Sequence, residues 1–114
     1  MAPETEKQVT ALAQRLLKLA ATSHWWHLGT KSYAQHKALG DLYGYLHEAA
    51  DGLVEPAVGD GMKIVEPKLD DMLAELRFLC GELKKLKGEP WLENIAQEID
   101  GQIYGYVYKL QRLS

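Results

Sequence analysis

Apolar residues recur at intervals of three and four along most of the chain, which is the spacing of an amphipathic helix. The first run predicts a helix over residues 4–27, with these apolar residues on one face: Val9, Leu12, Leu16, Leu19 and Ala20. Gly29 follows and is expected to stop the helix in the left-handed conformation. A second helix is predicted over residues 31–55, where Ser32 and Gln35 have the spacing of a capping box.

Pro56 is expected to end the second helix, because proline inside a helix removes a hydrogen bond and clashes with the preceding turn. Residues 56–66, "PAVGDGMKIVE", then form the main break in the chain. This connection could run straight back along a bundle or make a tight turn, and the sequence does not choose between them.

Two further helices are predicted after this break. The third covers residues 67–87, with Pro67 in its first turn and Gly88 at its end, and has this apolar stripe: Leu69, Met72, Leu73, Leu76, Leu79, Cys80, Leu83 and Leu86. The fourth covers residues 90–112 and buries Leu92, Ile95, Ile99, Ile103, Tyr106 and Leu110. No run alternates as a strand would, so we predict an all-α four-helix bundle that forms one domain over residues 1–114.

Composition narrows the class of protein. The chain has 114 residues, a net charge of −3, 46% hydrophobic and 25% charged residues, all typical of a soluble globular domain. The net negative charge makes nucleic acid an unlikely partner, and the apolar runs are shorter than the roughly 20 residues of a membrane span. The single cysteine, Cys80, cannot form a disulfide within the chain and is predicted to lie at a core position of a helix. This favours a reducing compartment and a cytoplasmic location.

Polar residues form a second stripe on the second helix, beside its apolar arc of Leu39, Leu42, Tyr43, Leu46, Ala50 and Leu53. This flanking stripe contains His36, Gly40, Gly44, His47, Asp51 and Glu55. Glycine inside a helix costs about 1 kcal/mol against alanine, so we expect a helix of another subunit to pack closely on Gly40 and Gly44. This predicts at least a homodimer. The plainer interpretation of His47 and Asp51 is a solvated pair one turn apart.

Residues 23–55, "SHWWHLGTKSYAQHKALGDLYGYLHEAADGLVE", hold all four histidines and resemble the Dps-type miniferritins, which oxidise and store iron. The shared features are the His24-Trp25 pair, Gly29, His36, and the acids Asp51 and Glu55. The resemblance implies a ferritin-like bundle in which His24 and His36 of one subunit and Asp51 and Glu55 of its two-fold partner bind iron. Trp25 would pack beside this metal site, and His47, one turn before Asp51, could support a ligand or replace one.

The chain also departs from that family. Gly40 stands where many members carry another acid, and the short helix in their middle connection has no counterpart here. Short phage-encoded ferritin-like proteins share a similar ending, "WLENIAQEID" then "YKLQRL". Two functions therefore stay open: a miniferritin that binds and oxidises ferrous iron at a dimer interface, and a non-catalytic helical oligomer, of viral or cellular origin, that serves as an interaction or structural module.

Overall fold

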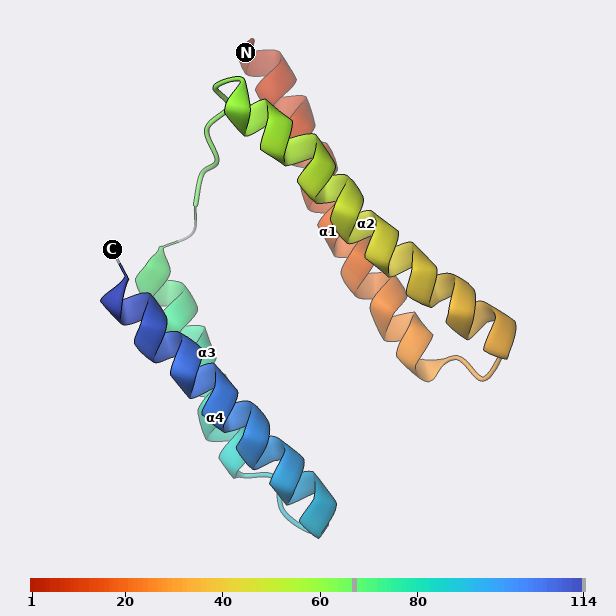
Figure 1. Cartoon of the computed structure of the whole chain (residues 1–114), viewed down its shortest axis with the longest axis vertical. Helices are drawn as coiled ribbons and strands as arrows, with labels where there is room; N and C mark the ends of the chain where they lie inside the picture. Colours follow the sequence, from red (N-terminus) through yellow and green to blue (C-terminus); the bar gives the residue numbers. More distant parts are fainter. Residues whose placement is uncertain (67, 114) are drawn as a thin grey trace. The chain divides into compact units, whose positions relative to one another are not determined.

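The computed structural model describes residues 1–66 and 68–113, and it contains four α-helices and no strand in these ranges. The helices are α1 (Pro3–Gly29), α2 (Tyr33–Gly59), α3 (Leu69–Lys84) and α4 (Pro90–Arg112). They divide between two compact units, Met1–Val65 and Glu66–Ser114. In the first unit α1 packs against α2, and in the second α3 packs against α4, each as an antiparallel pair (Figure 1). We call these units hairpin 1 and hairpin 2. The all-α class is confirmed.

The start of α2 follows the predicted cap, whereas its end does not. Ser32 Oγ accepts a hydrogen bond from the Gln35 amide at 3.3 Å, so Ser32 caps the helix as expected. The prediction that Pro56 ends α2 is wrong, because the helix continues to Gly59. Ala57, directly after the proline, is buried, and this packing offsets the hydrogen bond that Pro56 cannot make. The chain then turns at Gly61, whose φ of 102° favours glycine.

The helix ends predicted at Gly29 and Gly88 also differ from the structure. Gly29 does not adopt a positive φ; instead α1 ends where Thr30 becomes extended and its amide donates to the Trp26 carbonyl at 2.9 Å. The third helix ends at Lys84, and Gly88, with a φ of 120°, lies in the link to α4. The predicted place of Pro67 falls outside the described residues.

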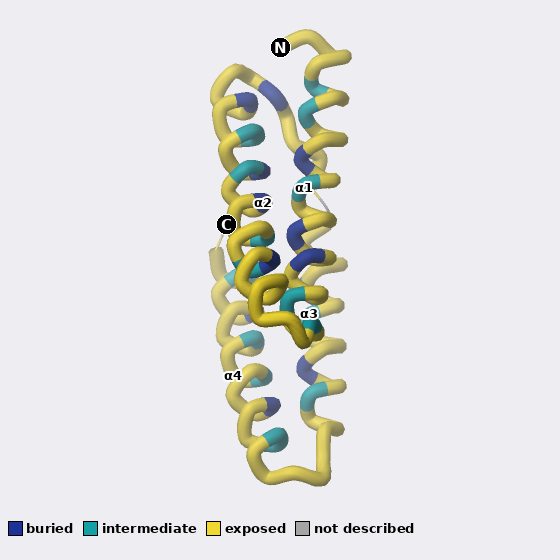
Figure 2. Tube along the Cα trace, turned by 90° about the vertical axis from the view of Figure 1, so that its right-hand side faces the viewer, coloured by how far each residue is buried: buried dark blue, intermediate teal, exposed yellow. Residues whose placement is uncertain are grey.

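Each hairpin is held together by one narrow line of contact per helix, which we call the inner seam. Its buried and half-buried residues are spaced alternately three and four apart, as in a coiled coil (Figure 2). On α1 they are Val9, Ala13, Leu16, Ala20, Ser23 and His27, and on α2 Leu39, Tyr43, Leu46, Ala50, Leu53 and Ala57. On α3 they are Leu73, Leu76, Cys80 and Leu83, and on α4 Glu93, Ala96, Asp100, Ile103, Val107 and Leu110. The alanines in these seams let the paired helices approach closely.

The predicted apolar faces are wider than the inner seams. In hairpin 1 a second line of apolar residues stays exposed and directly precedes inner-seam positions: Leu12, Leu19 and Trp26 on α1, and Leu42 on α2. In hairpin 2 the corresponding exposed residues are Met72 and Leu79 on α3 and Ile99 and Tyr106 on α4. We call these lines the outer seams. The prediction that Ile99 and Tyr106 are buried is wrong within hairpin 2, and Leu42, expected in the apolar arc of the second helix, is exposed within hairpin 1. The reason is that one partner helix covers only one seam.

The inner seam of hairpin 2 contains a polar pair. Cys80 is buried, as predicted, and its thiol donates to the Asp100 carbonyl at 3.8 Å. Burial, and then the neighbouring Asp100, raise the pKa of Cys80 above its usual 9.0. The Asp100 Oδ1 atom is buried and accepts no hydrogen bond from the residues that the structure describes, while its Oδ2 lies 3.9 Å from Lys84 Nζ.

Candidate metal centre at the turn of hairpin 1

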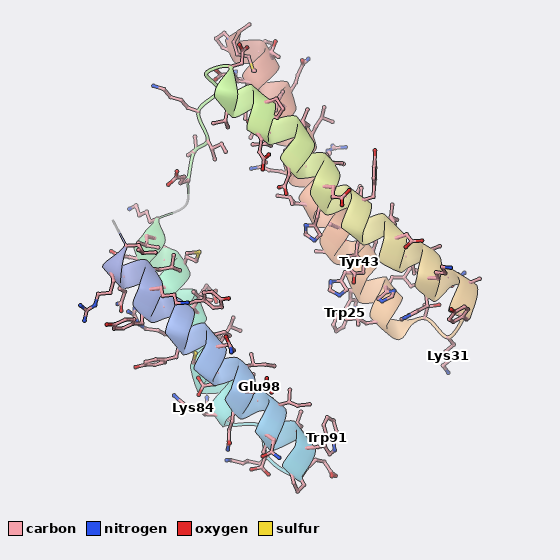
Figure 3. All side chains as sticks on the ribbon, viewed as in Figure 1. Trp25, Lys31, Tyr43, Lys84, Trp91 and Glu98 are labelled. Atoms are coloured by element: carbon pink, nitrogen blue, oxygen red, sulfur yellow. The ribbon has the colours of Figure 1, made fainter. Side chains whose placement is uncertain are left out.

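Three histidines and a tyrosine gather where α1 passes into α2. The His27 and His36 rings stack with centroids 3.7 Å apart and planes inclined by 20°. The His24 ring stacks on Tyr43 at 4.0 Å, and His27 meets the same tyrosine edge-on at 5.4 Å. Tyr43 lies on α2 across from the end of α1 (Figure 3). The spacing of the inner seams creates this cluster, because both Tyr43 and His27 are inner-seam residues.

Two reciprocal hydrogen bonds fix the ring nitrogens of His27 and His36. His36 Nδ1 lies 2.8 Å from the His27 carbonyl oxygen, and His27 Nδ1 bonds to the His36 carbonyl oxygen in turn. A carbonyl can only accept, so both Nδ1 atoms carry the hydrogen. In the neutral rings the Nε2 atoms are then left with their lone pairs. Histidines that bind metals are commonly oriented in this way.

The His27 ring of this cluster lies against Gly40. A Cβ atom at this position would lie 3.1 Å from His27 Cε1, closer than nearly all real contacts of this kind. At Gly44 a Cβ atom would have no neighbour within 4 Å. The absence of a side chain at Gly40 thus has an explanation inside hairpin 1, whereas Gly44 leaves an open place on the flank of α2.

The two acids lie farther along the same hairpin. Facing residues of α1 and α2 have numbers that add to 67, as in His24 with Tyr43 and His27 with Gly40. Asp51 stands two turns from Tyr43, about 12 Å along the helix axis, and Glu55 lies one turn beyond. Both acids are exposed. Asp51 also borders an apolar pocket of about 290 Å³ formed with the segment after α2, which includes Met62 and Ile64.

The four expected ligands do not meet within one chain. His24 and His36 belong to neighbouring ring pairs at one end of the hairpin, and the carboxylates lie nearer the other end. Across residues 1–66 and 68–113, no three histidine, cysteine or acidic side chains converge where they could hold an ion. A metal centre built from these residues therefore needs ligands from a second chain, as the resemblance implies.

The supporting residues lie on different faces. His47 is exposed on the same flank as Gly44 and Asp51. Trp25 is 78% exposed and stands out from α1 (Figure 3), so it does not pack beside the histidines in this chain. Sequence reasoning missed His27 and Tyr43 as members of the cluster. Aligning the two inner seams across the turn would have found both, since that register sets His27 beside Gly40 and His24 beside Tyr43.

Comparisons of the chain with protein-family models, curated proteins and solved structures find no match. None of the helices in the described ranges is long and apolar enough to cross a membrane.

Proposed function

We propose that this protein is a helical module that works by helix–helix association, as an interaction or structural component. The observation that supports this proposal is the pair of outer seams. Each hairpin leaves a line of exposed apolar residues, interrupted by a few polar ones, on the same side of both its helices. Exposed apolar patches that extend over several residues mark surfaces at which proteins associate.

The spacing of the outer-seam residues suits another helix as the binding partner. Residues spaced seven apart, such as Leu12, Leu19 and Trp26, present a straight line along α1, and a straight line of this period matches the seam of a partner helix. Two copies of one hairpin joined through their outer seams would make a four-helix bundle. We propose an association of this kind for the assembled form.

Site-directed labelling tests this function. Leu19 lies in the outer seam, whereas Leu28 is an exposed leucine on the opposite flank of α1. In a Cys80→Ala background, Leu19→Cys should react with a maleimide at least ten times more slowly than Leu28→Cys in the native protein. The two should react alike in urea. Equal rates in the native protein at all concentrations would show that the outer seam binds nothing.

Ferrous-iron oxidation at a dimer interface is the second candidate, and the register of hairpin 1 favours it. His24 of α1 lies level with Tyr43 of α2. Measured along α2, the midpoint between the levels of His24 and Asp51 is therefore residue 47. The midpoint between His36 and Glu55 lies between residues 45 and 46. A two-fold axis crossing α2 near His47 would bring the acids of one subunit level with the histidines of the other. The open flank at Gly44 leaves room for such an approach.

Imidazoles and carboxylates are suitable ligands for iron, and open coordination positions would admit oxygen or peroxide. Asp51→Ala should abolish ferrous oxidation, followed by the absorbance of ferric products, and His24→Ala should do likewise. Glu48→Ala provides the control, because it removes an exposed acid from the same helix outside the matched set. Calorimetry that detects no ferrous binding at neutral pH would remove this candidate and leave the helical module unaffected.

A further inference from the structure

The outer seam of hairpin 1 is an exposed apolar surface with no partner among the described residues of that unit. Leu12, Leu19 and Trp26 are each more than half exposed, at 55%, 54% and 58%. On α2, Leu42 is 44% exposed, and Tyr45, which directly precedes the inner-seam residue Leu46 and extends the outer seam, is 66% exposed. Each outer-seam residue is about 100° from the inner seam in the same rotational sense. Two antiparallel helices are related by a two-fold axis that is perpendicular to both of them. The outer-seam residues of α1 and those of α2 therefore lie on the same side of the hairpin.

The charges that border this outer seam differ between the two helices. From Lys7 to Gly29, the Lys, Arg, Asp and Glu residues of α1 are all basic, and two of them, Arg15 and Lys18, lie at or beside the outer seam. From Ala38 to Gly59, those of α2 are all acidic, and three of them, Asp41, Glu48 and Glu55, lie beside the outer seam, while Asp51 is on the opposite flank. Every ion pair among the described residues belongs to hairpin 2, so this separation of charge is not satisfied within hairpin 1.

A charge pattern of this kind distinguishes the two symmetric ways of pairing the outer seam with a copy of itself. A two-fold axis across the helices sets α1 against α1 of the partner, which brings basic edges together. A two-fold axis along the helices sets α1 against the partner's α2, which joins basic to acidic edges. Opposite charges across an interface favour the second arrangement and disfavour the first.

We propose, building on the function above, that hairpin 1 binds hairpin 1 of a second copy through the outer seams, with α1 beside the partner's α2. An axis along the helices keeps every residue at its own level. Lys18 then stands level with Glu48 of the partner subunit, since facing residues have numbers that add to 67 within about one. Arg15 stands level with Gly52 of the partner subunit, between Glu48 and Glu55, where the glycine leaves space for the long side chain.

The first test measures self-association of the full chain by sedimentation equilibrium. Leu19→Asp should weaken association by about 100-fold or more, because each dimer loses two buried leucines and gains two buried charges. Leu28→Asp introduces the same change on the opposite flank of α1 and should leave the dissociation constant within about threefold of the original. Circular dichroism of both variants should show unchanged helix content, so that a loss of association cannot be attributed to unfolding.

The second test uses milder substitutions that preserve folding. Lys18→Glu and Glu48→Lys should each weaken association by about five- to tenfold, since each removes two rim pairs from the dimer and replaces them with like charges. The double variant should recover most of the loss. Within one chain the two residues project from opposite sides of the hairpin, so recovery cannot come from an internal ion pair.

The outcomes separate this proposal from the function on which it rests. The proposed pairing is supported if Leu19→Asp dissociates the dimer and if the double variant, Lys18→Glu with Glu48→Lys, recovers the association that each single variant loses. A chain that stays monomeric at high concentration, with Leu19→Cys still protected from maleimide, shows that the seam is covered within the chain and overturns the proposal while the module survives. A monomer with an unprotected seam overturns both. Dimerisation without rescue by the double variant rejects the along-helix axis.

Discussion

At the scale of single residues, two glycines in one helix have different causes. Gly40 is small because the His27 ring, held by its stack and its hydrogen bond, occupies the space of a side chain. Gly44 meets nothing within 4 Å. Alanine at Gly44 should therefore stabilise hairpin 1 by about 1 kcal/mol through helix propensity. Alanine at Gly40 should lose most or all of that gain by displacing the ring. Urea unfolding at low protein concentration measures both, and an equal gain at the two positions would contradict this explanation.

The buried thiol in hairpin 2 gives a prediction about pH. The pKa of Cys80 is raised above 9.0, first by burial and then by Asp100, so the native state holds the proton more tightly than the unfolded chain. This contribution to stability is fully present below pH 9.0 and is lost as the pH rises through the native pKa. Unfolding followed by circular dichroism should show a steeper loss of stability above pH 9.0 in the original chain than in Cys80→Ala. Parallel curves would mean that the thiol titrates alike in both states.

At the scale of the elements, α2 shows how packing overrides a local signal. Pro56 lacks the amide that would bond to the Gly52 carbonyl, yet the helix runs on to Gly59 because Ala57 is buried behind it. Pro56→Ala restores the missing donor and should stabilise the end of α2 by about 1 kcal/mol, less than the full interior cost of proline because only one turn follows. Hydrogen exchange should show slower exchange for the amides of residues 57–59. Unchanged exchange there would indicate that the final turn is held by other contacts.

The sequence predicted the number of helices and the cap at Ser32, because periodicity and capping are local properties. It misjudged two helix ends: α1 ends at an extended Thr30 without a left-handed glycine, and α2 continues past Pro56, where the burial of Ala57 decides. It also merged the inner and outer seams into one face, since a stripe at helical spacing does not reveal how many partners share it. Of the side chains that cluster at the turn of hairpin 1, the sequence singled out His24 and His36 as expected ligands, which stays a prediction. It could not foresee that His27 stacks on His36, because this contact depends on the register of two helices.

At the scale of the whole molecule, the relative strength of apolar and charged contacts can be tested. The net charge is only −3, so repulsion between copies is weak and the outer seam should provide most of the affinity. The rim pairs in the proposed dimer are exposed, and such pairs contribute about 0.5 kcal/mol each. Raising sodium chloride from about 50 to 500 mM shortens the screening length to a few ångströms, and association should then weaken by no more than about tenfold. Sodium sulfate, which strengthens apolar burial, should tighten it. Dissociation at 500 mM sodium chloride, measured by sedimentation with Leu28→Asp as the control, would show instead that charge holds the copies together and that the seam only accompanies it.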